Sequence, residues 1–230
     1  MKEFAPVLLL IAFIIGGLGL FISFNSSSGE PETNQQSQSP TAERSILEQP
    51  KRLLIGDSGA RATLVEYFDY KCPACNQFHR GVGDEIKKEY LDTGLANLEI
   101  KITPVIGPDS ANAARGAYCA LEQNLFGEYH ETVINYMYDN YYASGNFAAE
   151  FDNILTTSEL ANITEPLGID RESFVDCVDS DTYNEYLNDN LLAAAEDGIR
   201  GTPGFAVGEQ SFVGGQPFTV FKTLLDIQLR

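Results

Sequence analysis

The sequence predicts an α/β protein whose small sheet is interrupted by a helical insertion, preceded by one N-terminal transmembrane helix. Two strand patterns flank a helical pattern within residues 62–105, and helical periodicity then dominates residues 108–200. Strand patterns return after Gly201. With 230 residues, of which 43% are hydrophobic, the chain is large enough to bury one sizeable core.

The transmembrane helix is predicted because residues 4–24 contain no charged side chain and are long enough to cross the hydrocarbon layer. No Ala-x-Ala site follows, so residues 1–24 are interpreted as an uncleaved signal anchor, with a cleaved signal as the alternative. Lys2 on one side and Glu30 and Glu32 on the other favour an internal N-terminus. We therefore expect a single-pass protein of the cell membrane with the rest of the chain on the extracytoplasmic side.

Residues 25–46 are predicted to be a flexible linker, because they are rich in Ser, Gln, Glu and Pro and lack an apolar anchor for a core. The folded domain is expected at residues 47–230. The formal net charge of −18 would repel phosphate backbones, so nucleic acid is not expected as a partner.

The first part of the predicted sheet is a strand, helix, strand unit. Residues 62–70 are β-branched and aromatic, as in a strand buried on both faces. Residues 73–90 form a helical pattern with Phe78, Val82 and Ile86 along one apolar stripe, and residues 98–105 alternate as a second strand. Such a unit builds a parallel pair of strands.

The rest of the domain is predicted as the helical insertion at about 108–200, then a hairpin and a final helix. Asp109 and Asp170 are candidate N-caps of helices in the insertion. Residues 204–207 and 211–213 read as strands joined by a turn at 208–209, and residues 218–229 as a helix.

The Cys72-Pro73-Ala74-Cys75 motif directly follows the first strand. Pro73 suits the first helical position, which makes Cys72 the N-cap, where unpaired N–H groups and the helix dipole stabilise a thiolate. Cys75 lies one turn later and can close a disulfide with Cys72. A structural zinc site is the alternative, but it needs four ligands, and the chain has no second CxxC pair.

These residues carry a resemblance. YFDYKCPACNQF at 67–78, GTPGF at 201–205 and the helical block between them resemble the DsbA-like thioredoxin superfamily of bacterial envelope oxidoreductases, over about residues 53–230. The resemblance implies a thioredoxin fold, with Cys72 as the attacking cysteine and Cys75 as the resolving one. It also implies a cis-proline at Pro203, opposite the disulfide, with the backbone of Thr202 pairing with an extended substrate peptide.

Five other residues lie within or near the motif in the sequence. Pro73 and Ala74 are expected to contact substrate, and Ala74 replaces the histidine of the best-known members, so a less depressed Cys72 pKa and a less oxidising potential are expected. Glu66 matches the position of a buried acid that relays the proton of the resolving cysteine, with a solvated strand-end acid as the alternative. Asp69 is expected at an exposed strand end, and His79 to be structural or solvated.

The remaining cysteines, Cys119 and Cys177, both fall in the insertion. An even number of cysteines in an exported chain suits two disulfides, and related envelope proteins often carry a second pair, so we predict that Cys119 pairs with Cys177. Two independent core cysteines are the alternative.

The predicted function is that of a thiol-disulfide oxidoreductase that introduces disulfides into exported cysteine-containing proteins. The resemblance implies reoxidation by a quinone-linked membrane oxidase of the DsbB or VKOR type, and no cofactor in the domain itself. Two alternative functions remain. The first is a disulfide reductase or isomerase of the same fold, which the reduction potential would distinguish from an oxidase. The second is a peptide- or metal-binding envelope module.

Overall fold

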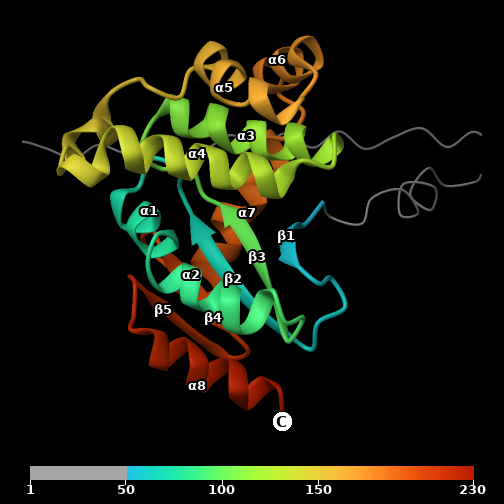
Figure 1. Cartoon of the computed structure of the whole chain (residues 1–230), viewed down its shortest axis with the longest axis vertical. Helices are drawn as coiled ribbons and strands as arrows, with labels where there is room; N and C mark the ends of the chain where they lie inside the picture. The colour runs from blue at the N-terminus through green and yellow to red at the C-terminus, as the bar shows by residue number, and fades with distance from the viewer. Residues whose placement is uncertain (1–50) are drawn as a thin grey trace, which may run out of the picture. The chain divides into compact units, whose positions relative to one another are not determined.

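The computed structural model describes residues 51–230, which contain one five-stranded sheet with helices on both faces (Figure 1). The strand order is β1-β3-β2-β4-β5. The predicted anchor at 1–24 and linker at 25–46 lie outside the described residues. Within the described part, no helix is long and apolar enough to span a membrane.

The centre of the sheet is the predicted strand, helix, strand unit. Strands β2 (Ala62–Phe68) and β3 (Ala96–Ile102) are parallel, with Leu64 opposite Leu98. β2 is shorter than the predicted 62–70, because residues 69–71 form the loop that leads into Cys72. β3 lies earlier than the predicted 98–105.

The single helix predicted at 73–90 is wrong in one respect, because it is interrupted. α1 spans Pro73–His79, α2 spans Val82–Ile86, and a π-helical turn, η2, covers Lys87–Leu91. Gly81, between α1 and α2, has φ −138° and ψ −101°, outside the helical region, so the chain changes direction there. The predicted apolar stripe still faces the core, since Phe78 and Ile86 are buried.

Three short strands complete the sheet. β1 (Leu53–Gly56), which the sequence analysis did not identify, pairs antiparallel with β3. The predicted hairpin is confirmed as β4 (Gly204–Val207) and β5 (Gln210–Val213), and β4 pairs antiparallel with β2. The final helix is confirmed as α8 (Phe218–Gln228).

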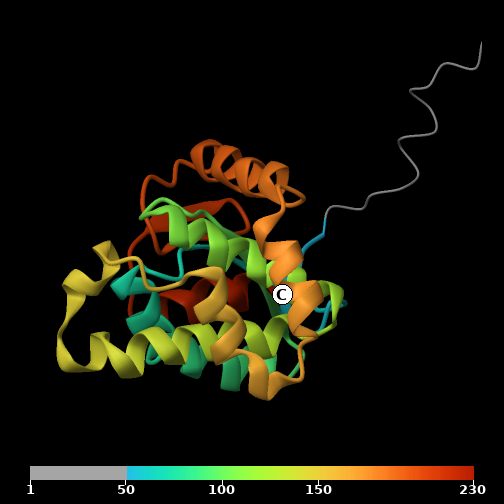
Figure 2. The same ribbon diagram turned by 90° about the horizontal axis from the view of Figure 1, so that it is seen from above.

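The helical insertion contains five α-helices and three 3₁₀ turns. The α-helices are α3 (Pro108–Glu122), α4 (Phe126–Asn140), α5 (Thr157–Ile163), α6 (Arg171–Asp179) and α7 (Asn184–Glu196). The turns are η3 (Tyr142–Ser144), η4 (Phe147–Phe151) and η5 (Glu165–Leu167). Helices α3 to α6 gather at one end of the sheet in Figure 1. Figure 2 shows α7 on the opposite side of the sheet from α4.

Three predictions about the insertion can be compared with the structure directly. Cys119 in α3 and Cys177 in α6 form a disulfide with an S–S distance of 2.02 Å, which joins these two helices. Asp170 caps α6, since its side chain accepts a hydrogen bond from the Ser173 N–H at 2.8 Å. The prediction that Asp109 is a helix N-cap is wrong, because Gly107 is the N-cap of α3. Asp109 lies within the first turn and has a different partner, described below.

Candidate active site

The dithiol motif lies at the N-terminus of α1, immediately after the loop that ends β2. Cys72 is the N-cap, with φ −72° and ψ 117°, and Pro73 occupies the first helical turn. The Cys75 N–H donates to Cys72 Sγ at 3.4 Å. Cys72 is 6% exposed and Cys75 is fully buried, and the two sulfurs are not joined in this structure. Only Cys72 can therefore meet an external thiol.

The pKa values of the two thiols move in opposite directions. A hydrogen bond from the Cys75 thiol lowers the pKa of Cys72 to about 7, although burial opposes the shift, and the N–H groups of Cys75 and Ala74 contribute. Burial raises the pKa of Cys75 well above its usual value, and the charges of Cys72 and Glu66 add to this. Near neutral pH the pair thus carries one nucleophilic thiolate and one protonated thiol.

A cis peptide bond joins Thr202 to Pro203, as the resemblance implied. The Thr202 carbonyl lies 3.3 Å from Cys72 Sγ, so this segment faces the dithiol directly. Pro203 is buried, Thr202 and Pro73 are partly exposed, and Ala74 is exposed. The three residues expected to contact substrate, Pro73, Ala74 and Thr202, thus come from the motif and from the segment that faces it, which also carries Pro203.

Glu66 lies in the middle of β2 and is fully buried, so the strand-end alternative is wrong. Its Oε2 lies 2.9 Å from Nε2 of His79, a residue that the sequence analysis set aside. Its Oε1 is buried and has no hydrogen-bond partner among residues 51–230. The spacing could have placed His79 on the same face of α1 as Cys75, which it follows by four residues, but its partner on β2 does not follow from the spacing.

Asp69 is not at an exposed strand end, and that prediction is wrong. Its carboxylate is fully buried and accepts four hydrogen bonds. The donors are the N–H groups of Lys71, Val105 and Ile106 and the hydroxyl of Ser110. Burial still raises the pKa of Asp69, and these hydrogen bonds oppose the rise. The carboxylate stabilises the turn that carries the chain from β2 to Cys72.

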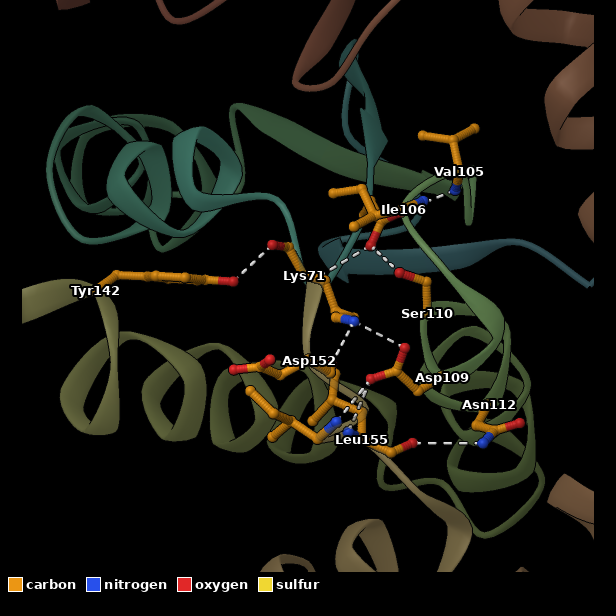
Figure 3. Close-up of polar contacts among 11 residues, drawn as sticks. Lys71, Val105, Ile106, Asp109, Ser110, Asn112, Tyr142, Asp152 and Leu155 are labelled. Atoms are coloured by element: carbon orange, nitrogen blue, oxygen red, sulfur yellow. Dashed lines mark hydrogen bonds and ion pairs between the residues drawn. The ribbon is translucent and has the colours of Figure 1, made fainter. Parts of the chain in front are cut away.

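Lys71, next to Cys72, is also buried, and its ammonium is held by the insertion (Figure 3). Nζ donates to Asp109 Oδ1 at 2.8 Å and to the Asp152 carbonyl at 2.7 Å. The Tyr142 hydroxyl donates to the Lys71 carbonyl at 2.6 Å. Asp109 is therefore the buried counter-ion of Lys71 rather than a helix cap, and the position of Cys72 depends on residues from three parts of the insertion.

The sheet, the dithiol at a helix N-terminus and the facing cis-proline together define a thioredoxin-fold protein. A family model described as thioredoxin matches residues 48–227. The chain belongs to this thioredoxin family, and its DsbA-like resemblance is confirmed. Among residues 51–230, no group of three or more His, Cys, Asp or Glu side chains is arranged to hold a metal ion.

Two relatives illustrate the similarity. A Rickettsia prowazekii protein named as a protein-disulfide oxidoreductase is 30% identical over 157 residues, which are 67% of this chain and 53% of that protein. Disulfide bond formation protein D of Bacillus subtilis is 23% identical over 202 residues, which are 86% of this chain and 85% of that protein. The chain spans about half the length of the Rickettsia relatives that it matches.

Solved structures share the fold. Oxidised BdbD from Bacillus subtilis matches with a TM-score of 0.67 and 20% identity, over 77% of this chain and 92% of that one. The Wolbachia pipientis α-DsbA1 structure matches with a TM-score of 0.64 and 23% identity, over 81% of this chain and 94% of that one. At these identities the comparison establishes architecture alone.

Proposed function

We propose that this chain is a protein-disulfide oxidoreductase that works as a dithiol oxidase and introduces disulfides into exported cysteine-containing proteins. The observation that carries the proposal is a dithiol at a helix N-terminus, with Cys72 6% exposed and Cys75 fully buried, that faces the cis Thr202–Pro203 segment. The names of its Rickettsia and Bacillus relatives, protein-disulfide oxidoreductase and disulfide bond formation protein, support the same activity.

The oxidase cycle begins with the Cys72–Cys75 disulfide. A substrate thiolate attacks Cys72 Sγ, a mixed disulfide forms, and Cys75 leaves with the electron pair and takes up a proton. A second substrate thiolate then attacks the substrate sulfur of the mixed disulfide. Cys72 leaves as a thiolate, which its pKa of about 7 favours, since a thiol of lower pKa leaves faster. The substrate is oxidised by two electrons, and the dithiol is reduced by two.

Reoxidation of the dithiol requires an electron acceptor outside the domain. We propose a quinone-linked membrane oxidase of the DsbB or VKOR type as that partner. The uncharged segment at residues 4–24 supports an anchor that keeps the domain beside such a partner, on the extracytoplasmic side of the cell membrane.

A reductase of the same fold is the second candidate, and one observation favours it. The Cys72 pKa of about 7 is close to the value of about 7 in thioredoxin and above the value of about 3.5 in DsbA. Ala74, in place of a histidine, removes one source of thiolate stabilisation.

The equilibrium potential of the Cys72–Cys75 pair against glutathione tests the proposal, with Cys72→Ser and Cys75→Ser proteins as controls that have no such equilibrium. A potential of roughly −120 to −180 mV would support the oxidase. A value near about −270 mV would identify the reductase instead. Absence of any disulfide exchange in the wild-type protein would contradict both the oxidase and the reductase.

A further inference from the structure

Three ionisable side chains near the dithiol, Cys75, His79 and Glu66, come from α1 and β2. Cys75 and His79 are four residues apart on one face of α1, and His79 contacts Glu66 of β2. Cys75 and Glu66 are fully buried, whereas the His79 side chain is 14% exposed. A proton on Cys75 has no direct contact with solvent, but one on His79 does.

One oxygen of the Glu66 carboxyl has a hydrogen-bond partner, and the other has none among the described residues. Oε2 lies 2.9 Å from His79 Nε2, and Oε1 has no partner in the described structure. An unpaired buried carboxyl oxygen destabilises the folded state, so its presence calls for an explanation. The charge of Glu66 is close enough to Cys75 to act on that thiol. Because Oε1 has no other partner among the described residues, it can take up a proton released by Cys75.

His79 also lines a cavity of about 320 Å³ between α1, α2 and α4. The polar residues of its wall include His130, Arg80, Asp84, Lys87, Glu128 and Glu131. Of these, His130 is buried, with its ring centroid 5.0 Å from that of His79. The charged side chains can hold water at this face of His79, which gives a proton a way out of the protein.

We propose that His79 is the outer member of a proton relay that connects Cys75 through Glu66 to water in this cavity. The inference rests on the proposed function and deepens it. When Cys75 attacks the mixed disulfide, the Cys75–Cys72 bond forms, the bond from Cys72 to the external sulfur breaks, and the external thiolate leaves. The Cys75 proton passes to Glu66, from Glu66 to His79, and from His79 to water. When Cys75 is itself the leaving group, the proton moves in the opposite direction.

A single experiment separates this relay from the proposed function. The reduced protein is mixed with an aromatic disulfide whose thiolate is coloured, and release of the thiolate is followed by stopped flow at several pH values. The first release reports attack by Cys72, and the second reports closure by Cys75. His79→Gln, which keeps a hydrogen-bonding amide but cannot carry a proton at these pH values, should slow the second release about 10-fold to 100-fold and flatten its pH dependence.

The controls compare a carboxylate outside the cavity with the members of the relay. Glu85→Gln, which changes an exposed carboxylate of α2 that does not line the cavity, should leave both releases unchanged. Glu66→Gln should reproduce the defect, and the double variant should be no slower than either single variant, because the two residues act in series. Imidazole in the buffer should restore the second release of His79→Ala, which a merely structural role would not predict.

Two results would overturn the relay while leaving the proposed function intact. One is a second release in His79→Gln with the rate and pH dependence of the wild type. The other is equal slowing of both releases, which would identify a structural role for His79. If the wild-type protein gave no first release, the proposed function itself would fail.

Discussion

Replacing Asp109 by Asn tests whether the buried Lys71–Asp109 pair holds the active-site loop. The side chains are each 2% exposed, and the ammonium and carboxylate are 2.8 Å apart. Asp109 Oδ2 also accepts the N–H groups of Ile154 and Leu155, at 2.9 and 3.1 Å. Asn has nearly the same shape and a single acceptor oxygen, so it can serve Lys71 or these two N–H groups, but not both.

The expected loss follows from the unpaired ammonium. Removing one partner of a buried ion pair typically costs about 3 to 5 kcal/mol, and we expect about 3 kcal/mol for Asp109→Asn, because the amide retains part of the hydrogen bonding. With an m-value of about 2 kcal/mol/M, the urea midpoint should fall by roughly 1.5 M. The assay is urea unfolding, followed by circular dichroism with the Cys119–Cys177 disulfide intact.

Two further variants make the result decisive. Lys71→Met added to Asp109→Asn removes the uncompensated charge, so the double variant should be more stable than Asp109→Asn alone by at least about 1 kcal/mol. Lys87→Ala breaks the exposed pair with Asp92 and should cost less than about 1 kcal/mol. A loss below about 1 kcal/mol for Asp109→Asn, or no recovery in the double variant, would refute the reasoning.

Three other predictions follow from single features. The rate of Cys72 alkylation in the reduced protein should rise with pH and reach half its maximum near pH 7, because only the thiolate reacts; a midpoint above pH 8 would contradict this. Replacing both Cys119 and Cys177 by Ala should lower the free energy of unfolding by about 4 kcal/mol, as measured by urea unfolding, since the disulfide closes a loop with a sequence separation of 58. Gly204→Ala should cost about 1 to 3 kcal/mol in the same assay, because the added methyl group meets the Ile199 side chain; a neutral substitution would show that Ile199 moves aside.

The sequence was sufficient wherever a local pattern decides the structure. The parallel pair β2 and β3, the hairpin of β4 and β5 and the final helix were each predicted from local composition, periodicity or turn residues. The position of Cys72 at a helix N-terminus follows from the strand before it and the proline after it. The break at Gly81 was missed, because the apolar stripe continues across it and isolated glycines are tolerated within helical patterns.

The environment of the dithiol could not be predicted in the same way. Asp69 and Lys71 look like surface residues in the sequence, and their burial depends on partners 36 to 81 positions away in the chain. The His79 contact with Glu66 is likewise a tertiary one, between a helix and a strand. The β1 strand has only four residues, too few for a period to be recognised.

The contacts of Lys71 also limit how the helical insertion can be exchanged for that of another family member. Residues of the helical insertion, Asp109, Tyr142 and Asp152, reach the residue next to Cys72 (Figure 3). A chimera with the insertion of another family member could retain all four cysteines in its sequence. It would still lose the contacts that hold Lys71 beside Cys72, unless these three partners were retained as well. The insertion and the motif must therefore be exchanged together, and variation in one restricts the sequences that the other can accept.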